Sequence, residues 1–101
     1  MRFSQLRCHL GVLLDAAGRR EEASQWFRQA AGAGDADAMC NLGVLLDAAG
    51  RREEAEEWFR QAAGAGHIAA MDNLGTLLEE MGRHDEAEQW YRQADTKHRA
   101  S

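Results

Sequence analysis

The stretch LGVLLDAAGRREEA occupies Leu10–Ala23 of the 101-residue chain and recurs letter for letter at Leu42–Ala55. A third LG pair begins at Leu74, so related segments follow one another at a constant step of 32 residues. Self-similarity at a fixed period of this length is the sequence signature of repeat architectures. The chain is therefore predicted to be one repeat domain over residues 1–96, with units at about 4–35, 36–67 and 68–96, and a frayed tail over 97–101.

Each unit carries two helical patterns separated by a glycine. In the middle unit, Ala38, Leu42, Leu45 and Ala49 recur at steps of three and four residues, which places them on one face of a helix. Gly50 ends that helix, and RREEAEEWFRQAA begins the next one. Helices this short are marginal alone in water, so stacking of the units must stabilise them. Helices are predicted near residues 4–17, 20–32, 36–49, 52–64, 68–81 and 84–96.

The charge balance excludes some classes of partner. With 17 acidic and 12 basic residues the formal net charge is -5, whereas binding to nucleic acid or an anionic membrane needs clustered Lys and Arg. No apolar run approaches the ~20 residues needed to cross a bilayer. Charged side chains are expected on solvated helix faces, with Asp35 capping the helix that follows it and Glu56 pairing with Arg60.

The two cysteines and the N-terminal residues give information on where in the cell the protein is located. Cys8 and Cys40 hold equivalent repeat positions, and neighbouring helices lie about 8–10 Å apart, beyond the roughly 4.4–6.8 Å Cα spacing of a disulfide. Reduced thiols favour a cytoplasmic location. The start MRFSQLRCHLGVLLDAAG has the charge and apolar run of a short secretion signal, but LGVLLDAAG recurs inside the chain, which favours a structural role.

Eight positions of the middle unit carry the same or a similar residue in the third unit. The first unit also matches, except that Arg7 stands where the other units have methionine. The set is Met39, Leu42, Gly43, Leu46, Gly50, Ala55, Phe59 and Ala62. This spacing resembles the tetratricopeptide repeat, W-x-x-L-G-x-x-Y followed by A-x-x-x-F, and the join AAGAGDADAMCNLG is similar to Sel-one-like repeats. The resemblance implies an all-α fold, a right-handed α-solenoid of three antiparallel helix hairpins. Letter identity at exposed positions such as Arg19 indicates recent duplication or design by consensus.

The resemblance also implies a concave groove, lined by the first helix of each unit, that binds an extended or helical peptide. The groove positions it implies are Gln5, Cys8, His9, Val12, Asp15, Asp37, Cys40, Asn41, Val44, Asp47, Ala69, Asp72, Asn73, Thr76 and Glu79. Asn41 and Asn73 match a position where the family uses asparagine to hold a peptide backbone. The expected role is a protein-interaction scaffold with a mildly acidic groove for a basic or amphipathic peptide. The alternative is a structural or designed self-assembling module with no natural ligand.

Nothing in the sequence indicates catalysis, a cofactor or a metal site. His9, His67, His84 and His98 show no regular ligand spacing, and no nucleophile shares a helix face with a base. The chain is therefore predicted not to be an enzyme and to need no cofactor. One tryptophan per unit is expected to pack in or near the core: Trp26, Trp58 and Trp90.

The ends of the array are predicted to associate. A solenoid is stable only if its terminal units hide the faces meant for neighbours, and the sequence shows no separate capping helix. Self-association is expected through the last helix or through Leu6, Leu10 and Leu13 of the first, as a two-fold homodimer or by exchange of hairpins. The alternative is that further repeats supply the cap. The residues expected on the C-terminal association face are Ala87, Trp90, Tyr91 and Ala94.

Overall fold

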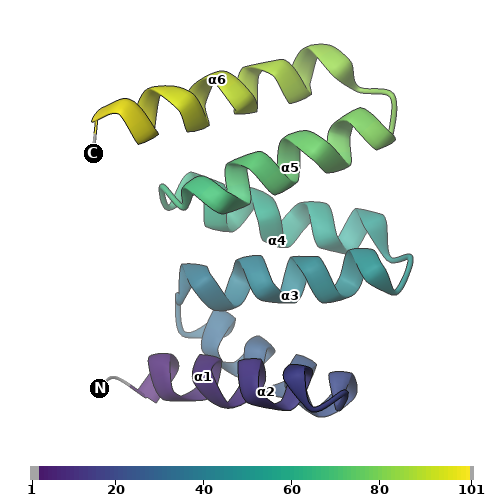
Figure 1. The fold of residues 1–101 in the computed structure, drawn as a ribbon, viewed down its shortest axis with the longest axis vertical. Coiled ribbons are helices and arrows are strands. Elements are labelled where there is room, and N and C mark those ends of the chain that lie inside the picture. Colours follow the sequence, from purple (N-terminus) through teal and green to yellow (C-terminus); the bar gives the residue numbers. More distant parts are fainter. Residues whose placement is uncertain (1–2, 101) are drawn as a thin grey trace.

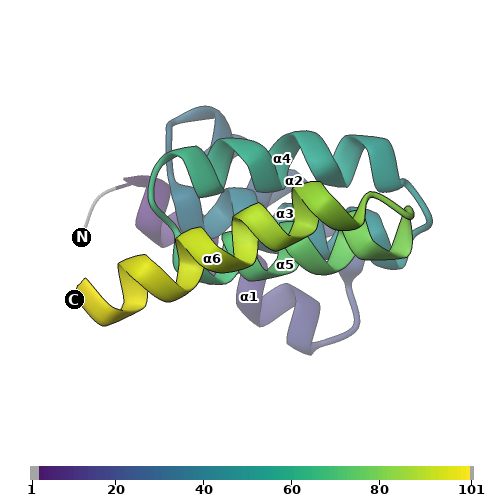
Figure 2. The ribbon, with the colours of Figure 1, turned by 90° about the horizontal axis from the view of Figure 1, so that it is seen from above.

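The computed structural model describes residues 3–100, which form helices joined by short turns and contain no strand. The helices are α1 (Phe3–Ala16), α2 (Arg20–Gly32), α3 (Ala36–Ala48), α4 (Arg52–Gly64), α5 (Ile68–Glu80) and α6 (His84–Ala100). Each odd-numbered helix packs against the next as a hairpin, and α2 with α3 and α4 with α5 join the hairpins. Figure 1 shows the hairpins stacked in chain order, with α1, α3 and α5 as successive layers, and Figure 2 shows the stack from above, with α6 nearest the viewer. The predicted solenoid of three hairpins is confirmed.

The turn inside each hairpin has the same geometry in all three units. Gly18, Gly50 and Gly82 have φ angles of 80°, 80° and 79°, in the left-handed region that glycine enters without strain. In the middle unit, the N–H of Arg51 then donates to the carbonyl oxygen of Leu46 at 2.9 Å, which satisfies a carbonyl at the end of α3. The turn requires its glycine, which explains part of the repeated sequence.

Within each hairpin the two helices approach closely at a second glycine. A Cβ atom placed on Gly43 would lie 2.6 Å from Cε1 of Phe59, too near for any real contact. The same geometry relates Gly11 to Phe27 at 2.6 Å, and Gly75 to the ring of Tyr91 at 2.7 Å. The aromatic ring of the second helix therefore rests directly on the glycine backbone of the first.

The core fills the space between these contacts with small and branched apolar residues. Ala23, Ala55 and Ala87, one per unit, are fully buried where the second helix crosses the first. Leu42 and Leu74 are also fully buried, whereas their counterpart Leu10 is only partly buried. Trp58 and Trp90 pack against the core, as predicted, and Trp26 is partly buried.

Two predicted polar contacts are present. The Asp35 carboxylate accepts from the backbone N–H of Ala38 at 3.1 Å and caps α3. The guanidinium of Arg60 donates through Nε to Glu56 at 2.8 Å, one helical turn away.

The end of the last helix differs from the sequence prediction, which stopped it at 96 and assigned a frayed tail to 97–101. In the structure α6 continues to Ala100, and Ser101 lies outside the described residues. No glycine follows Ala94, unlike the second helices of the other units, so nothing ends the helix there. Arg99 pairs with Asp95 at 3.3 Å, and basic residues in the last turn complement the helix dipole.

Candidate peptide-binding groove

The first helices of the three units together line a hollow on one face of the solenoid. Its volume is about 480 Å3. Nine of the ten lining residues belong to the predicted groove, so the structure brings most of that set together. The lining residues are Cys8, His9, Val12, Asp37, Cys40, Asn41, Val44, His67, Ala69 and Asn73.

A ladder of amide-to-thiol contacts forms the floor of the hollow. Nδ2 of Asn41 donates to Sγ of Cys8 at 3.7 Å, and Nδ2 of Asn73 donates to Sγ of Cys40 at 3.4 Å. Each contact joins the first helices of two neighbouring units. An amide carries two N–H donors and one oxygen acceptor, so one thiol contact leaves capacity for a ligand.

Both thiols are buried and free of disulfides. Burial raises the pKa of the Cys8 thiol, and the nearby Asp35 carboxylate raises it further. Burial likewise raises the pKa of the Cys40 thiol, although the hydrogen bond from Asn73 partly opposes this effect. Because a raised pKa keeps a thiol neutral, both cysteines contribute weakly polar, uncharged groups to the floor.

His67 is the lining residue that the sequence analysis did not assign to the groove. Its Nδ1 accepts from the backbone N–H of Ala70 at 3.1 Å and caps α5, as Asp35 caps α3. Its Nε2 lies 2.7 Å from Oδ1 of Asp37, and since Nδ1 is an acceptor, Nε2 is the donor. The repeat spacing indicates this cap, because His67 stands 32 residues after Asp35, which caps the first helix of the middle unit.

The other predicted groove residues lie around the hollow and not inside it. Oδ1 of Asp15 lies 3.9 Å from Arg20, and Oδ1 of Asp47 lies 4.0 Å from Arg52. Gln5 lines a separate surface hollow between the first and second units, and Asp72 lines one between α5 and α6. By helix periodicity Asp15, Asp47 and Glu79 share the helix face of the groove positions, and these acidic side chains are called the rim below.

In the third unit, groove residues of α5 are hydrogen-bonded to Tyr91 of α6. The hydroxyl of Tyr91 donates to Oε1 of Glu79 at 2.5 Å and lies 3.1 Å from Oγ1 of Thr76. Burial raises the pKa of Tyr91, and its hydrogen bond to the Glu79 carboxylate acts in the same direction. Glu79 and Thr76 thus already have an internal partner in Tyr91.

The residues expected on the C-terminal association face divide into two groups. Ala87 is 0% exposed and belongs to the core of the chain, whereas Ala94, at 3% exposed, lines the hollow between α5 and α6 together with Tyr91. Trp90 and Tyr91 are partly buried against the same core. The reason is that α6 turns this side toward α5, the other helix of its own hairpin.

Within residues 3–100, no group of three or more His, Cys, Asp or Glu side chains is arranged to hold a metal ion. The same residues include no helix that is both long and apolar enough to cross a membrane.

Comparison with known families identifies the repeat. A tetratricopeptide repeat model matches residues 36–63 and 67–100, and a second tetratricopeptide repeat model matches residues 4–29. The chain belongs to the tetratricopeptide repeat family, whose members are protein-interaction scaffolds. No curated protein sequence gives a significant match.

Solved structures of MamA share the fold. One crystal structure of MamA superposes with a TM-score of 0.84 at 24% identity, covering 96% of this chain and 59% of the MamA chain. A second crystal structure of the MamA protein gives a TM-score of 0.78 at 24% identity, covering 93% of this chain and 54% of the other. The present chain thus spans a little more than half the length of these MamA chains.

Proposed function

We propose that the face formed by α1, α3 and α5 binds an extended or amphipathic peptide that carries basic residues. The observation that supports this proposal most directly is the hollow of about 480 Å3, to which all three units contribute side chains. A ligand lying across it would contact each unit in turn, as expected for a family of protein-interaction scaffolds.

The walls of the hollow offer apolar surface. Val12 is 47% exposed and Val44 is 48% exposed, although both are large hydrophobic residues in the middle of helices. They hold equivalent positions in the first and middle units, and Thr76 takes the position in the third. Covering the two valines with apolar side chains of a ligand would remove that surface from water, which favours binding by about 25 cal/mol per Å2.

The rim supplies the preference for basic residues. Asp15 and Asp47 lie at the outer limit of ion-pair distance from their arginine neighbours, so their carboxylates remain open to a stronger partner. Asp37 contributes a carboxylate to the hollow, where it accepts from His67. Lys or Arg side chains of a ligand would complement this rim, in keeping with the net charge of -5.

The floor supplies groups for a peptide backbone. The oxygens of the Asn41 and Asn73 amides are suited to accept from ligand N–H groups while Nδ2 stays on the thiols. The same ladder fixes the amide planes before a ligand arrives, which lowers the entropic cost of binding.

Selection from a display library of random 12-residue peptides tests the proposal. Selected peptides should combine Lys or Arg with apolar residues, and their affinity should fall with rising salt because the rim pairs are exposed. Binding should weaken in Val44→Asp and in Asp47→Ala, and should be unchanged in the control Glu57→Ala on α4. If no peptide is enriched, or if Val44→Asp binds as well as the unmodified chain, the structural alternative without a ligand is favoured.

A further inference from the structure

We infer that copies of this chain stack head to tail, with α1 of one copy packed on α5 and α6 of another, so that the solenoid continues across the junction. The N-terminal face is defined here by Phe3, Leu6, Leu13 and Glu22. The C-terminal face is defined by Ile68, Asp72, Arg92, Asp95 and His98. This inference concerns the first and last units and shares only His9 and Asp72 with the groove proposal.

The N-terminal face exposes apolar side chains that the repeat normally covers. Leu6 is 46% exposed, whereas its counterparts Ala38 and Ala70 are fully buried. Leu13 is 62% exposed, whereas its counterpart Leu77 is 1% exposed. In the middle and third units the second helix of the preceding unit packs on this side, as α4 packs on α5. Phe3, at 80% exposed, extends the uncovered surface.

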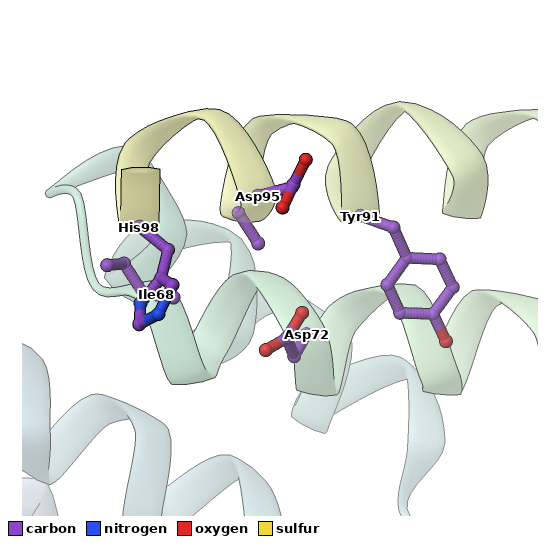
Figure 3. Close-up of a pocket in the computed structure, with 6 residues that line it drawn as sticks. Ile68, Asp72, Tyr91, Asp95 and His98 are labelled. Atoms are coloured by element: carbon purple, nitrogen blue, oxygen red, sulfur yellow. The ribbon is translucent and has the colours of Figure 1, made fainter. Parts of the chain in front are cut away.

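The C-terminal face contains a hollow in which the first helix of another copy can pack. A hollow of about 300 Å3 lies between α5 and α6 and is lined by residues of both helices, five of which are labelled in Figure 3. The same positions one unit earlier include Cys40, Phe59 and Ala63, which are 5%, 2% and 3% exposed beneath the third unit. The hollow therefore marks the place where the first helix of a following unit packs inside the array.

The ion pairs between units give the strongest argument for a second copy as the occupant. At the first junction Glu54 accepts from Arg28 of the preceding unit at 2.9 Å and from Arg51 of its own unit at 2.6 Å. At the second junction Glu86 likewise accepts from Arg60 of the preceding unit and from Arg83 of its own.

Each end of the chain carries one half of this arrangement. Glu22, the counterpart of Glu54, has its own-unit partner Arg19 at 2.6 Å, but no unit precedes it in the described chain. Arg92, the counterpart of Arg60, pairs with Glu88 on its own helix and is 77% exposed. Head-to-tail stacking brings Arg92 of one copy to Glu22 of the next, which repeats the internal pair.

The amide-to-thiol ladder gives a second, independent match. The two internal rungs are Asn41 with Cys8 and Asn73 with Cys40. At a junction between copies the corresponding residues are His9 and Asp72, a pair of an imidazole donor and a carboxylate acceptor. The amide and the thiol are thus replaced together by groups that remain complementary. His67 and Asp37 show the same pair inside the chain at 2.7 Å.

Two charged residues oppose the junction, Asp95 and also Arg7, which stands where Met39 and Met71 are buried in the other units. Asp95 stands where Ala31 and Ala63 are buried, and its carboxylate pairs with Arg99 at 3.3 Å. Partial burial of this carboxylate makes the association weak and reversible. A two-fold contact between C-terminal faces is disfavoured because it would set Asp72 and Asp95 against the same residues of the other copy. A two-fold contact between N-terminal faces would leave Arg92 without Glu22.

Sedimentation velocity from about 10 µM to about 1 mM, the range in which weak contacts assemble, tests the inference. Heterologous contacts that do not close form an open series, so the weight-average mass should rise continuously beyond a dimer. Arg92→Glu and Glu22→Arg should each weaken the association roughly fivefold to tenfold, and the double variant should recover it. Asp95→Ala should tighten the association, and the control Glu57→Arg should leave it unchanged. Circular dichroism verifies that each variant is folded.

Three results overturn the inference. The first is a monomer at every concentration up to about 1 mM, which shows that the ends do not recognise each other. The second is a species that stops at a dimer, which indicates a two-fold contact or exchange of hairpins. The third is failure of the double variant to regain the association that each single variant loses, which shows that Arg92 and Glu22 do not meet.

Discussion

Replacing Gly43 by alanine tests the contact that holds each hairpin together. An added Cβ would lie 2.6, 2.7 and 2.9 Å from Cε1, Cδ1 and Cζ of Phe59, which is only 2% exposed and packed in the core. Overpacking of this kind costs about 1–3 kcal/mol, while alanine at a helix interior regains up to about 1 kcal/mol over glycine. We expect a net loss of about 1–2 kcal/mol, which lowers the melting temperature by roughly 5–15 °C for a domain of this size.

Urea denaturation followed by circular dichroism measures this loss, with two comparisons. Gly64→Ala is the matched control, because a Cβ at Gly64 meets nothing within 4 Å and its φ is not positive. Gly43→Ala combined with Phe59→Leu should cost less than the sum of the two single changes, by about 1 kcal/mol, because the smaller side chain relieves the clash. If Gly43→Ala is as stable as Gly64→Ala, the helices do not approach as described and the reasoning fails.

Three further changes probe caps, burial and charge. Asp35→Ala removes the cap of α3 and should lower the free energy of unfolding by about 1 kcal/mol in thermal melts. Leu77→Ala should cost about 2–5 kcal/mol in urea melts, whereas the equivalent Leu13→Ala at an exposed position should cost far less. Hydrogen bonds from Arg60, then from Arg83, lower the pKa of Glu86, so its stabilisation is complete above about pH 4.5 and is lost as the pH falls through the lowered pKa. Thermal melts against pH should show a smaller acid loss in Glu86→Gln.

The repeat could be predicted from the sequence because its structural requirements are local and recur. A left-handed turn needs Gly50 and the close approach needs Gly43, and both recur in each unit at the same step. The end of α6 was predicted less well because the glycine that follows the other second helices is missing after Ala94. Where no residue forces a helix to stop, its length depends on the weak pairs and dipole effects of the last turn.

Nine of the predicted groove positions line one hollow, but the partners of their side chains were not predicted. Asn41 was expected to hold a peptide, and it also donates to Cys8 of the preceding unit. His67 was missed because a cap is recognised in sequence by residue type, and histidine is not among the preferred cap residues. Contacts of this kind depend on how neighbouring units are placed, which the pattern within one unit does not specify.

Two positions that are buried in the middle unit carry a different residue in the third unit. In the third unit Asp72 replaces the cysteine of the floor and Asp95 replaces a buried alanine, and both changes fall on the face where a following unit would pack. A copy that only continued the core would have kept cysteine and alanine there, as the middle unit does. Carboxylates at these two positions favour hydration of this face, while Arg92, on the same helix as Asp95, has the position of the arginine that the internal junctions use. If copies stack as inferred above, this face combines hydration with complementarity to the first unit, which is the condition for an association that forms reversibly.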